Sequence, residues 1–292
     1  MKILIIGHSV VDHINDVIKP GGIYYSAAGL YNFKNEEDEI SLLTSFSEES
    51  LIHFGNLYSK INIGLSKKVE RVPSVYLKIH KDKEREECYS NLTDKLFISH
   101  EIDFNKYDCI YINMVSGFDI NIEDLKLIRS QFSGQIYFDV HTFSRGLDEN
   151  NNRYFRRIPD AKEWLSNIDI LQTNENEIFT LSDETDLNKI INEIFESGVK
   201  YLLITKGENG VSIFYKENSI VKSISENAVK VNAVNPVGCG DIFGAVYIYS
   251  YIKSGNFETA LKTANSVAGV CTSYKSFEEF KNLKRDVNRF IN

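Results

Sequence analysis

The sequence predicts an α/β protein in which helices cover both faces of a mostly parallel sheet, with a small β hairpin that stands off that sheet. The first observation is the alternation of short apolar runs with amphipathic segments along most of the 292 residues. The second is the segment 70–91, which alternates with period two around a charged turn and predicts a hairpin with one polar face. The third is the segment 231–255, where a proline, two glycines and one carboxylate precede a long apolar run.

Apolar periodicity and the turn residues at the ends of each segment define the individual elements. Strands are expected at 2–7, 40–46, 107–114, 134–140, 168–173, 200–207, 210–215 and 231–234. Helices are expected at 23–33, 47–61, 121–132, 159–167, 174–182, 187–198, 241–253, 257–274 and 277–291. The hairpin at 70–91 is open to two interpretations, a flap over a site or a simple edge hairpin. No linker or repeat divides the chain, so one domain over residues 1–292 is expected.

Composition excludes several functional classes. The net charge is −8 and the sequence pI is about 5.4, and no extended basic patch points to nucleic acid. No apolar run reaches the roughly 18–20 residues of a membrane span, and the N-terminus lacks the pattern of a signal peptide. The four cysteines are far apart and show no metal-ligand spacing, which favours thiols in a reducing cytoplasm over a zinc site.

Gly238, Cys239, Gly240 and Asp241 stand at the predicted start of a helix. Glycines permit a sharp turn and a close approach of a ligand to the backbone, and free N–H groups at a helix N-terminus attract anions. Asp241 can act as a helix cap, or as a base that deprotonates a substrate hydroxyl while the N–H groups hold a phosphoryl group. The segment alone leaves both interpretations open. The motifs GxxxxGK[ST] and GxGxxG are absent.

This segment resembles the GAGD signature of the ribokinase (PfkB) family of carbohydrate and nucleoside kinases. Other motifs of that family follow in the same order along nearly the whole chain: GHSVVD at 7–12, GGIYYSAA at 21–28, NENE at 174–177, TKGENG at 205–210 and TANSVAG at 263–269. Each motif is weak alone, and their order and spacing make the resemblance specific. It implies a ribokinase-like three-layer αβα domain whose β lid comes from 70–91 and part of 10–25.

The resemblance implies a role for each matched residue. Asp241 is the catalytic base, and the N–H groups of Gly238, Cys239 and Gly240 stabilise charge on the transferring phosphoryl group. The sugar-like substrate is bound by Asp12, Gly21 and Gly22, with Ser26 at the position of the family's substrate-binding Asn. ATP is bound by Thr205, Gly207, Gly210 and Asn265, and Mg²⁺ is held through water by Asn174 and Glu177. Lid pairing between subunits implies a homodimer.

The chain departs from the family pattern at several positions. Asn235 stands where the family has an Asp that is tied to a monovalent-cation site, and this puts activation by K⁺ in question. Ile23 replaces the Lys of ribokinases proper, and tyrosines follow it, so an inositol, a nucleoside or a modified sugar is as good a candidate as ribose. His141 lies in FDVHTFSRG, and a local hydrogen-bonding role is favoured over catalysis.

Three functions compete. The favoured one is a cytoplasmic, ATP-dependent phosphotransferase with an alcohol group as acceptor, acting on a sugar, inositol or nucleoside with Mg²⁺. The second is a catalytically inactive binding or regulatory protein on the same fold, which Asn235 and Ser26 suggest. The third, a dinucleotide-binding oxidoreductase, fits the α/β alternation but lacks the glycine fingerprint. Neither a nucleic acid nor a membrane is an expected partner.

Overall fold

The computed structural model describes residues 1–14, 17–78, 86–92 and 94–291 and has a large central sheet. The strand order in this sheet is β16-β15-β14-β13-β10-β9-β1-β4, and all neighbouring pairs are parallel except those that involve β15 and β16. Its strands are β1 (Lys2–Ile6), β4 (Glu39–Leu43), β9 (Cys109–Asn113), β10 (Gln135–Asp139), β13 (Ile170–Asn174), β14 (Tyr201–Thr205), β15 (Val211–Glu217) and β16 (Ile220–Glu226).

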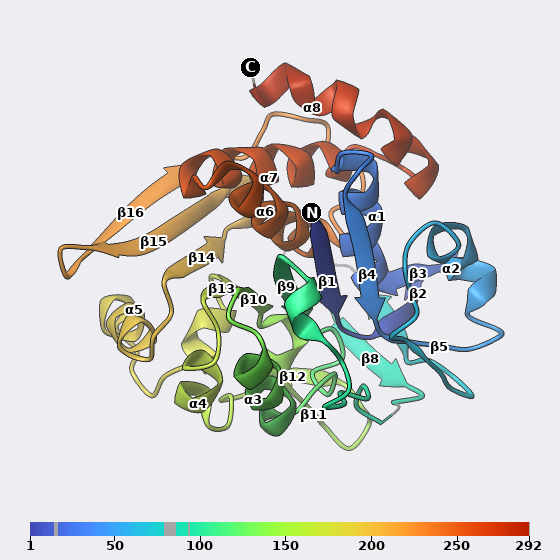
Figure 1. Cartoon of the computed structure of the whole chain (residues 1–292), viewed down its shortest axis with the longest axis horizontal. Helices are drawn as coiled ribbons and strands as arrows, with labels where there is room; N and C mark the ends of the chain where they lie inside the picture. Colours follow the sequence, from blue (N-terminus) through green and yellow to red (C-terminus); the bar gives the residue numbers. More distant parts are fainter. Residues whose placement is uncertain (15–16, 79–85, 93, 292) are drawn as a thin grey trace.

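Helices cover both faces of this sheet (Figure 1). One face packs against α1 (Ile23–Phe33), α6 (Cys239–Ser254) and α7 (Phe257–Thr272) in a core that includes Ile3, Ile5 and Tyr111. The other face packs against α3 (Ile122–Gln131), α4 (Ala161–Leu165) and α5 (Leu187–Glu196) around Leu4, Ile6 and Ile112. Successive residues of β1 from Ile3 onward therefore enter opposite cores, and this explains why the strand is apolar from Ile3 to Ile6. The remaining helices are α2 (Leu51–Tyr58) and α8 (Leu283–Ile291).

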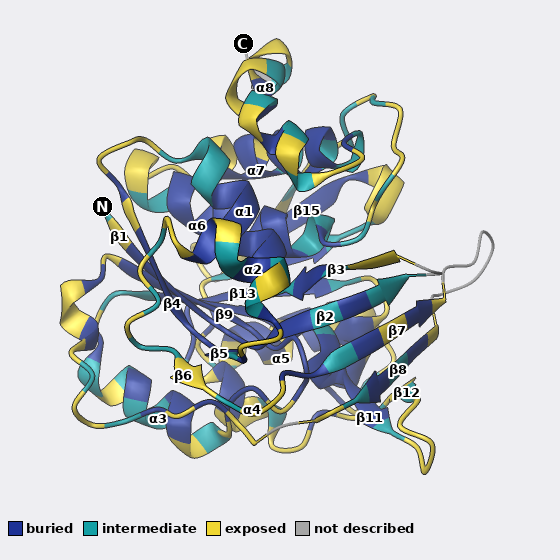
Figure 2. Cartoon of the chain, turned by 90° about the vertical axis from the view of Figure 1, so that its right-hand side faces the viewer, coloured by how far each residue is buried: buried dark blue, intermediate teal, exposed yellow. Residues whose placement is uncertain are grey.

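A second sheet of four strands stands beside the central sheet, and we call it the lid sheet (Figure 2). Its order is β3-β2-β7-β8, with β2 (Ser9–Ile14), β3 (Val17–Gly22), β7 (Ser74–Lys78) and β8 (Glu86–Ser90). β7 and β8 pair antiparallel, so the hairpin predicted at 70–91 is present, although its turn lies outside the described residues. The strands Ser9–Ile14 and Val17–Gly22 supply the other half of the sheet.

A short hairpin of β11 (Arg145–Leu147) and β12 (Arg153–Phe155) lies against the edge of the lid sheet. The Tyr89 N–H donates to the carbonyl oxygen of Asn151 over 3.1 Å, and Cys88 pairs with Asn152 in an isolated bridge. A further pair, β5 (Ser45–Phe46) and β6 (Lys67–Lys68), joins two loops.

Several predicted elements require correction. The helix expected at 174–182 is a single 3-10 turn, Glu177–Thr180, because Asn174 and Glu177 bond to each other's backbone. The strand expected at 231–234 is absent from these described residues, and the N–H groups of Val234 and Asn235 instead donate to the carbonyl oxygen of Thr272. β16 was not predicted, and the final helix is divided into a 3-10 segment, Phe277–Asn282, and α8.

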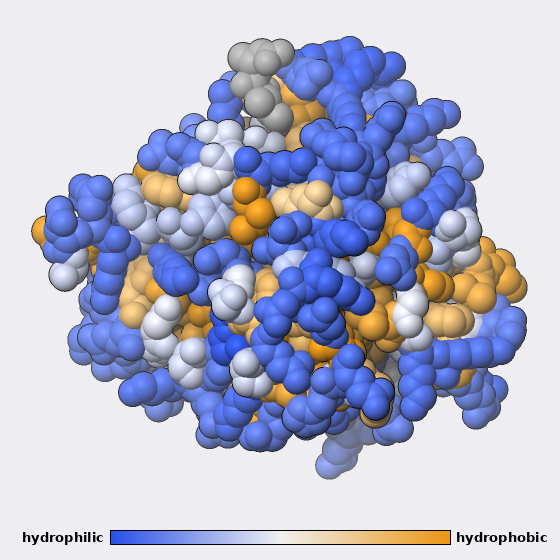
Figure 3. All heavy atoms as spheres, viewed as in Figure 1, coloured by the Kyte–Doolittle hydropathy of each residue, from blue (hydrophilic) through white to orange (hydrophobic). Residues whose placement is uncertain are grey.

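The exposed surface in the view of Figure 3 is mainly hydrophilic, with apolar groups scattered over it. Among the helices that the structure describes, each is too short or too polar to cross a membrane.

Candidate active site

Asp241 lies in the first turn of α6, and Gly238 precedes this helix in the left-handed conformation with φ 81°. A Cβ atom at Gly238 would lie 2.2 Å from the ring of Tyr25. Glycine is therefore required here both by the backbone conformation and by the close approach of the ring. The Cys239 N–H donates to the carbonyl oxygen of Pro236 over 3.3 Å. This N–H group of the predicted anion cradle therefore already has a partner within the chain.

Asp241 is buried, and side chains from two elements, β9 and α1, position it. Asn113 at the end of β9 donates from Nδ2 to Asp241 Oδ1 over 2.5 Å. Ser26 of α1 donates from Oγ to the backbone oxygen of Asp241 over 3.1 Å, and Tyr111 donates to the same oxygen over 3.4 Å. The helix start is thus tied to the central sheet and to α1, and a fixed position suits a base that must meet a hydroxyl in one geometry.

A small, partly open cavity of about 30 Å³ lies between Asp241 and the lid sheet. It is lined by the polar residues Asp12, Glu87, His141 and Asp241, by Gly22 and Gly238, and by the apolar or aromatic residues Val10, Tyr25, Val75, Leu77, Tyr89, Val115 and Val237. The structure therefore brings together residues that are more than two hundred positions apart in the chain. Figure 2 shows how the lid sheet stands beside the central one.

Asp12 lies on β2, and the glycines Gly21 and Gly22 of the neighbouring strand β3 leave room for its side chain. Its cross-strand partner is Lys19, and the adjacent Gly21 lies so close that a Cβ atom there would come within 2.2 Å of Asp12 Oδ1. Gly22 has φ 59°, and a Cβ atom there would meet the His8 carbonyl oxygen at 2.5 Å. Both glycines are therefore needed to seat the buried Asp12 carboxylate and to begin α1. Burial lowers the pKa of Lys19, and the negative charge of Asp12 partly opposes this.

Asn174 and Glu177 cap the turn after β13. The Asn174 side-chain oxygen accepts from the N–H groups of Asn176 and Glu177, over 2.9 Å and 2.8 Å, and Glu177 Oε2 accepts from the Asn174 N–H over 2.8 Å. The Asn174 amide oxygen is thus occupied by capping bonds. The Glu177 carboxylate is the better of the two for a role toward a cation.

A buried carboxyl group that no motif contained lies between Glu177 and Asp241. Asp139 ends β10 and accepts a bond from Gln172 Nε2 over 2.9 Å. Burial, and then the negative charges of Glu177 and Asp241, raise the pKa of Asp139 well above its usual range. Asp139 at the end of β10, Glu177 in the turn after β13 and Asp241 at the start of α6 therefore repel one another electrostatically, and a cation would relieve this repulsion.

The predicted nucleotide-binding residues lie on the other side of α6. Thr205 ends β14 and donates to the Thr173 carbonyl oxygen over 3.3 Å. Gly207 and Gly210 have φ 54° and 88°, and a Cβ atom at Gly210 would lie 2.0 Å from the Glu226 carbonyl oxygen. The tight turn between β14 and β15 therefore requires glycine at 210. Asn265 on α7 donates from Nδ2 to the Asn227 carbonyl oxygen over 2.7 Å.

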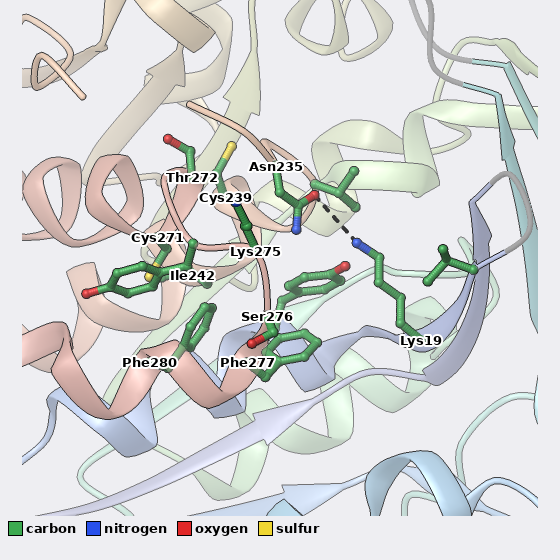
Figure 4. Close-up of a pocket in the computed structure, with 14 residues that line it drawn as sticks. Lys19, Asn235, Cys239, Ile242, Cys271, Thr272, Lys275, Ser276, Phe277 and Phe280 are labelled. Atoms are coloured by element: carbon green, nitrogen blue, oxygen red, sulfur yellow. Dashed lines mark hydrogen bonds between the residues drawn. The ribbon is translucent and has the colours of Figure 1, made fainter. Parts of the chain in front are cut away.

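A second cavity, of about 210 Å³, lies beside the start of α6 (Figure 4). Asn235 is in its wall, and Asn235 Oδ1 lies 3.5 Å from the Lys19 Nζ. Cys239, Cys271 and Phe277 line the same cavity. The position at which the family has a charged Asp thus carries an amide that contacts the chain's own ammonium group.

Sequence reasoning did not find several residues that position this site: Asn113, Gln172, Glu87, Tyr89 and Arg153. Asn113 and Gln172 sit at strand ends, which is where an α/β sheet collects its site, and that rule was the available signal. Glu87 and Tyr89 belong to the predicted hairpin, whose inward face could be read from its alternation. Arg153 had no local signal. His141 lines the small cavity, and its N–H donates to Asp139 Oδ1 over 3.2 Å.

The architecture is the ribokinase fold. The structure of Arabidopsis thaliana ribokinase complexed with ribose and ATP has 16% sequence identity and a TM-score of 0.72, with 100% of this chain and 98% of that chain covered. A pyrophosphate-dependent kinase in the ribokinase family, complexed with a pyrophosphate analog and myo-inositol, has 18% identity and a TM-score of 0.74 over 96% of this chain and 99% of that one. The predicted fold class is confirmed.

Sequence comparison relates the chain to the pfkB family carbohydrate kinases, whose profile matches residues 144–281. The deoxyribokinase of Salmonella typhi is 27% identical over 177 residues, which are 54% of this chain and 56% of that protein. The matched region thus spans about half the length of that curated relative. The resemblance predicted from the motifs is confirmed, and the matched profile contains the Asn174, Thr205 and Asp241 segments.

Proposed function

We propose that this protein is an ATP-dependent phosphotransferase that phosphorylates a hydroxyl group of a small sugar-like acceptor, with Asp241 as the base. The carrying observation is the cavity whose lining contains both the buried Asp241 carboxylate and the buried Asp12 carboxylate of the lid sheet. A hydroxyl bound by Asp12 would lie in the same cavity as a fixed base, and the start of α6 provides N–H groups for a phosphoryl group.

Mg²⁺ fits the carboxylates of the donor side. Asp139, Glu177 and Asp241 are all buried, and their mutual repulsion is what raises the pKa of Asp139 after burial itself. Mg²⁺ prefers oxygen ligands and keeps several waters, so Glu177 with water between them is a suitable holder. When bound, Mg²⁺ would neutralise charge on the donor phosphates. Asn174 would act mainly by orienting Glu177, because its own oxygen caps the turn.

The phosphoryl donor has a second candidate, pyrophosphate. In the structure, residues 227–229 lie directly on α7: Asn265 bonds to Asn227, and a Cβ atom at Gly269 would come within 2.2 Å of Val229 Cγ2. The family resemblance places adenine beside Asn265, so ATP binding requires this stretch to move, whereas pyrophosphate binding does not. ATP is the proposed donor. Pyrophosphate is the second candidate because the packing of residues 227–229 on α7 leaves the predicted adenine position covered.

The deciding experiment measures product formation with ATP or pyrophosphate as donor, in the presence of Mg²⁺, with and without K⁺. Acceptors are sugars, inositols and nucleosides, and Asp241→Asn is compared with the wild type. Asp183→Asn, at a fully exposed carboxylate, is the matched control. Turnover of one acceptor that is lost in Asp241→Asn alone supports the proposal. Equal inactivity of wild type and Asp241→Asn, with ligands that still raise the melting temperature, favours the inactive binding protein.

The outer face of the lid sheet supports a homodimer. Ile18, His13 and Tyr76 form one cross-strand row on this face, where Ile18 and Tyr76 are 52% and 49% exposed and His13 stacks on Tyr76 with ring centroids 4.5 Å apart. We propose that a second copy covers this row. Light scattering that gives a mass near twice 33.4 kDa is the expected result, and the monomer mass would contradict it.

A further inference from the structure

The lid sheet buries a second carboxylate, Glu87, in the wall of the small cavity. Glu87 is 4% exposed and lies on β8, where Glu87 and Tyr89 are buried while Glu86, Cys88 and Ser90 are not. This alternation makes Glu87 an inward-facing residue of the sheet. Apolar side chains would be enough to pack the inner face of the lid sheet. Burying a carboxylate there costs free energy, so packing alone does not explain why Glu87 is at this position.

The strand register places Glu87 on the same face of the lid sheet as Asp12. Asp12 pairs with Val75 of β7, and Val75 pairs with Tyr89 of β8, so these three form one cross-strand row. The pair Leu77 and Glu87 lies two rows further along, beyond the row that contains Tyr76, and successive rows face opposite sides of the sheet. Asp12 and Glu87 are therefore on strands separated by β7 and share one face, and both line the cavity that contains Asp241.

One positive charge that acts on Glu87 comes from outside the cavity. Arg153 of β12 lies over the Tyr89 ring, with its guanidinium carbon 4.1 Å from the ring centroid, and donates to the carbonyl oxygen of Ser116. Burial lowers the pKa of Arg153, and the charges of Tyr89 and Glu87 oppose this. Arg153 does not line the cavity, and neither does Lys19, which lines the larger cavity beside Asn235.

Within the described parts of the chain, the small cavity thus presents the carboxylates of Asp12, Glu87 and Asp241, with no lysine or arginine in its lining. An acceptor that carries a phosphate or carboxylate would meet three negative groups in a space shielded from water. A hydroxyl or amine can instead donate a hydrogen bond to each carboxylate.

We propose that Glu87 is a specificity-determining residue that accepts hydrogen bonds from the acceptor and, with Asp12, restricts it to polyhydroxyl compounds without an anionic group. This inference rests on the proposed phosphotransferase function and deepens it. Sugar phosphates are excluded as acceptors, and neutral or amine-bearing polyols are accepted. The lid thereby selects the acceptor by charge as well as by shape.

The test compares matched acceptor pairs: ribose with ribose 5-phosphate, myo-inositol with myo-inositol 1-phosphate, and glucosamine with glucosamine 6-phosphate. The accepted member of the active pair is expected to have a kcat/KM at least about 100-fold above its phosphorylated partner. Glu87→Gln is expected to raise the acceptor KM about tenfold or more and to leave the donor KM within about twofold. Glu86→Gln, on the exposed face of the same strand, is the matched control and should behave as wild type.

If Glu87 only formed a structural ion pair with Arg153, Glu87→Gln would lower the melting temperature but would not raise the acceptor KM selectively over the donor KM. Comparable turnover of a phosphorylated acceptor, or a Glu87→Gln acceptor KM equal to that of Glu86→Gln, overturns the inference while the kinase proposal stands. Ligand-induced shifts of the melting temperature, measured without donor, separate the two proposals. If no donor supports turnover, neutral polyols that stabilise the wild type but not Glu87→Gln still support the inference, and equal stabilisation by the phosphorylated compounds overturns it.

Discussion

The proposed acceptor side of the site has the buried carboxylates of Asp12 and Glu87 on the lid sheet, whereas the proposed donor side, with Gly207 and Asn265, lies near the surface. On the acceptor side the two carboxylates line one cavity and are fixed by strand register. On the donor side the turn after β14 is exposed, and α7 is covered by the chain's own residues 227–229. Under the proposed function, this contrast predicts that acceptor recognition is preorganised and that ATP binding involves rearrangement.

The largest effect is expected at Asp241, where the two sides meet. Asp241→Asn keeps the shape but removes the base, so kcat should fall about 10³-fold or more while both KM values change by less than about threefold. Steady-state kinetics with the best acceptor measure this. A variant that retains more than about a tenth of the wild-type kcat would contradict the role of Asp241 as base.

The preorganised side should show a large effect on binding. Asp12→Asn removes a buried charged acceptor of hydrogen bonds, so the acceptor KM should rise about 10- to 100-fold. The donor KM should stay the same, because Asp12 lies on the lid sheet and not beside α7. Equal increases in both KM values would indicate that the lid sheet has lost its structure, and circular dichroism of the variant checks that outcome.

The junction between the two sides depends on one glycine. Gly238→Ala places a Cβ atom 2.2 Å from the Tyr25 ring at a residue with φ 81°, so we expect a loss of about 3 kcal/mol in the free energy of unfolding. Gly240→Ala is the matched control, since its Cβ atom meets only Gln172 Nε2 at 3.6 Å. Urea denaturation measures both. A similar loss in the two variants would show that the conformation at Gly238 is not the cause.

On the donor side, Asn265→Ala should have a small effect. The side chain is already bonded to the Asn227 carbonyl oxygen, so ATP gains little from it unless residues 227–229 move. The ATP KM should change less than about fivefold, and the acceptor KM should not change. An increase of about 50-fold would show that the donor side is as preorganised as the acceptor side.

The last prediction concerns the pH dependence of stability. The pKa of Asp139 is raised in the folded protein, so between the unfolded pKa of about 3.9 and the folded value the folded state holds a proton that the unfolded chain has lost. Stability should therefore decrease as pH rises through this window, by up to about 1.4 kcal/mol per pH unit. Asp139→Asn should remove this decrease. Urea denaturation from pH 5 to pH 8 measures the slope, and an unchanged slope would contradict the assignment.

The local turns of the proposed donor side could be predicted from the sequence, and the packing of the proposed acceptor side could be predicted only in part. Gly210 and Glu177 lie in short motifs whose turns require particular residues, so each motif carries the local pattern by itself. The roles of Thr205, Gly207 and Asp12 stay predictions that rest on their motifs.

Other residues depend on packing between distant segments. Asn113 reaches Asp241 across 128 positions, and Glu87 acquires its place only when β7 and β8 pair with β2. No local period marks such contacts. The strand expected at 231–234 was wrong for the same reason, because its N–H groups are satisfied by Thr272 at the end of a helix and not by a neighbouring strand. Local apolar character could not reveal that partner.

Cys239 gives the start of α6 a chemical reporter. Its side chain lines the cavity of about 210 Å³ and is partly exposed, whereas Cys271 in the same cavity is buried, and burial raises the pKa of its thiol. An alkylating reagent should therefore modify Cys239 before Cys271. Because the modified thiol belongs to the loop that would hold the donor phosphates, the alkylation rate at Cys239 can be followed peptide by peptide as a footprint of occupancy. The natural replacement of alanine by cysteine thus allows donor binding to be read without any turnover.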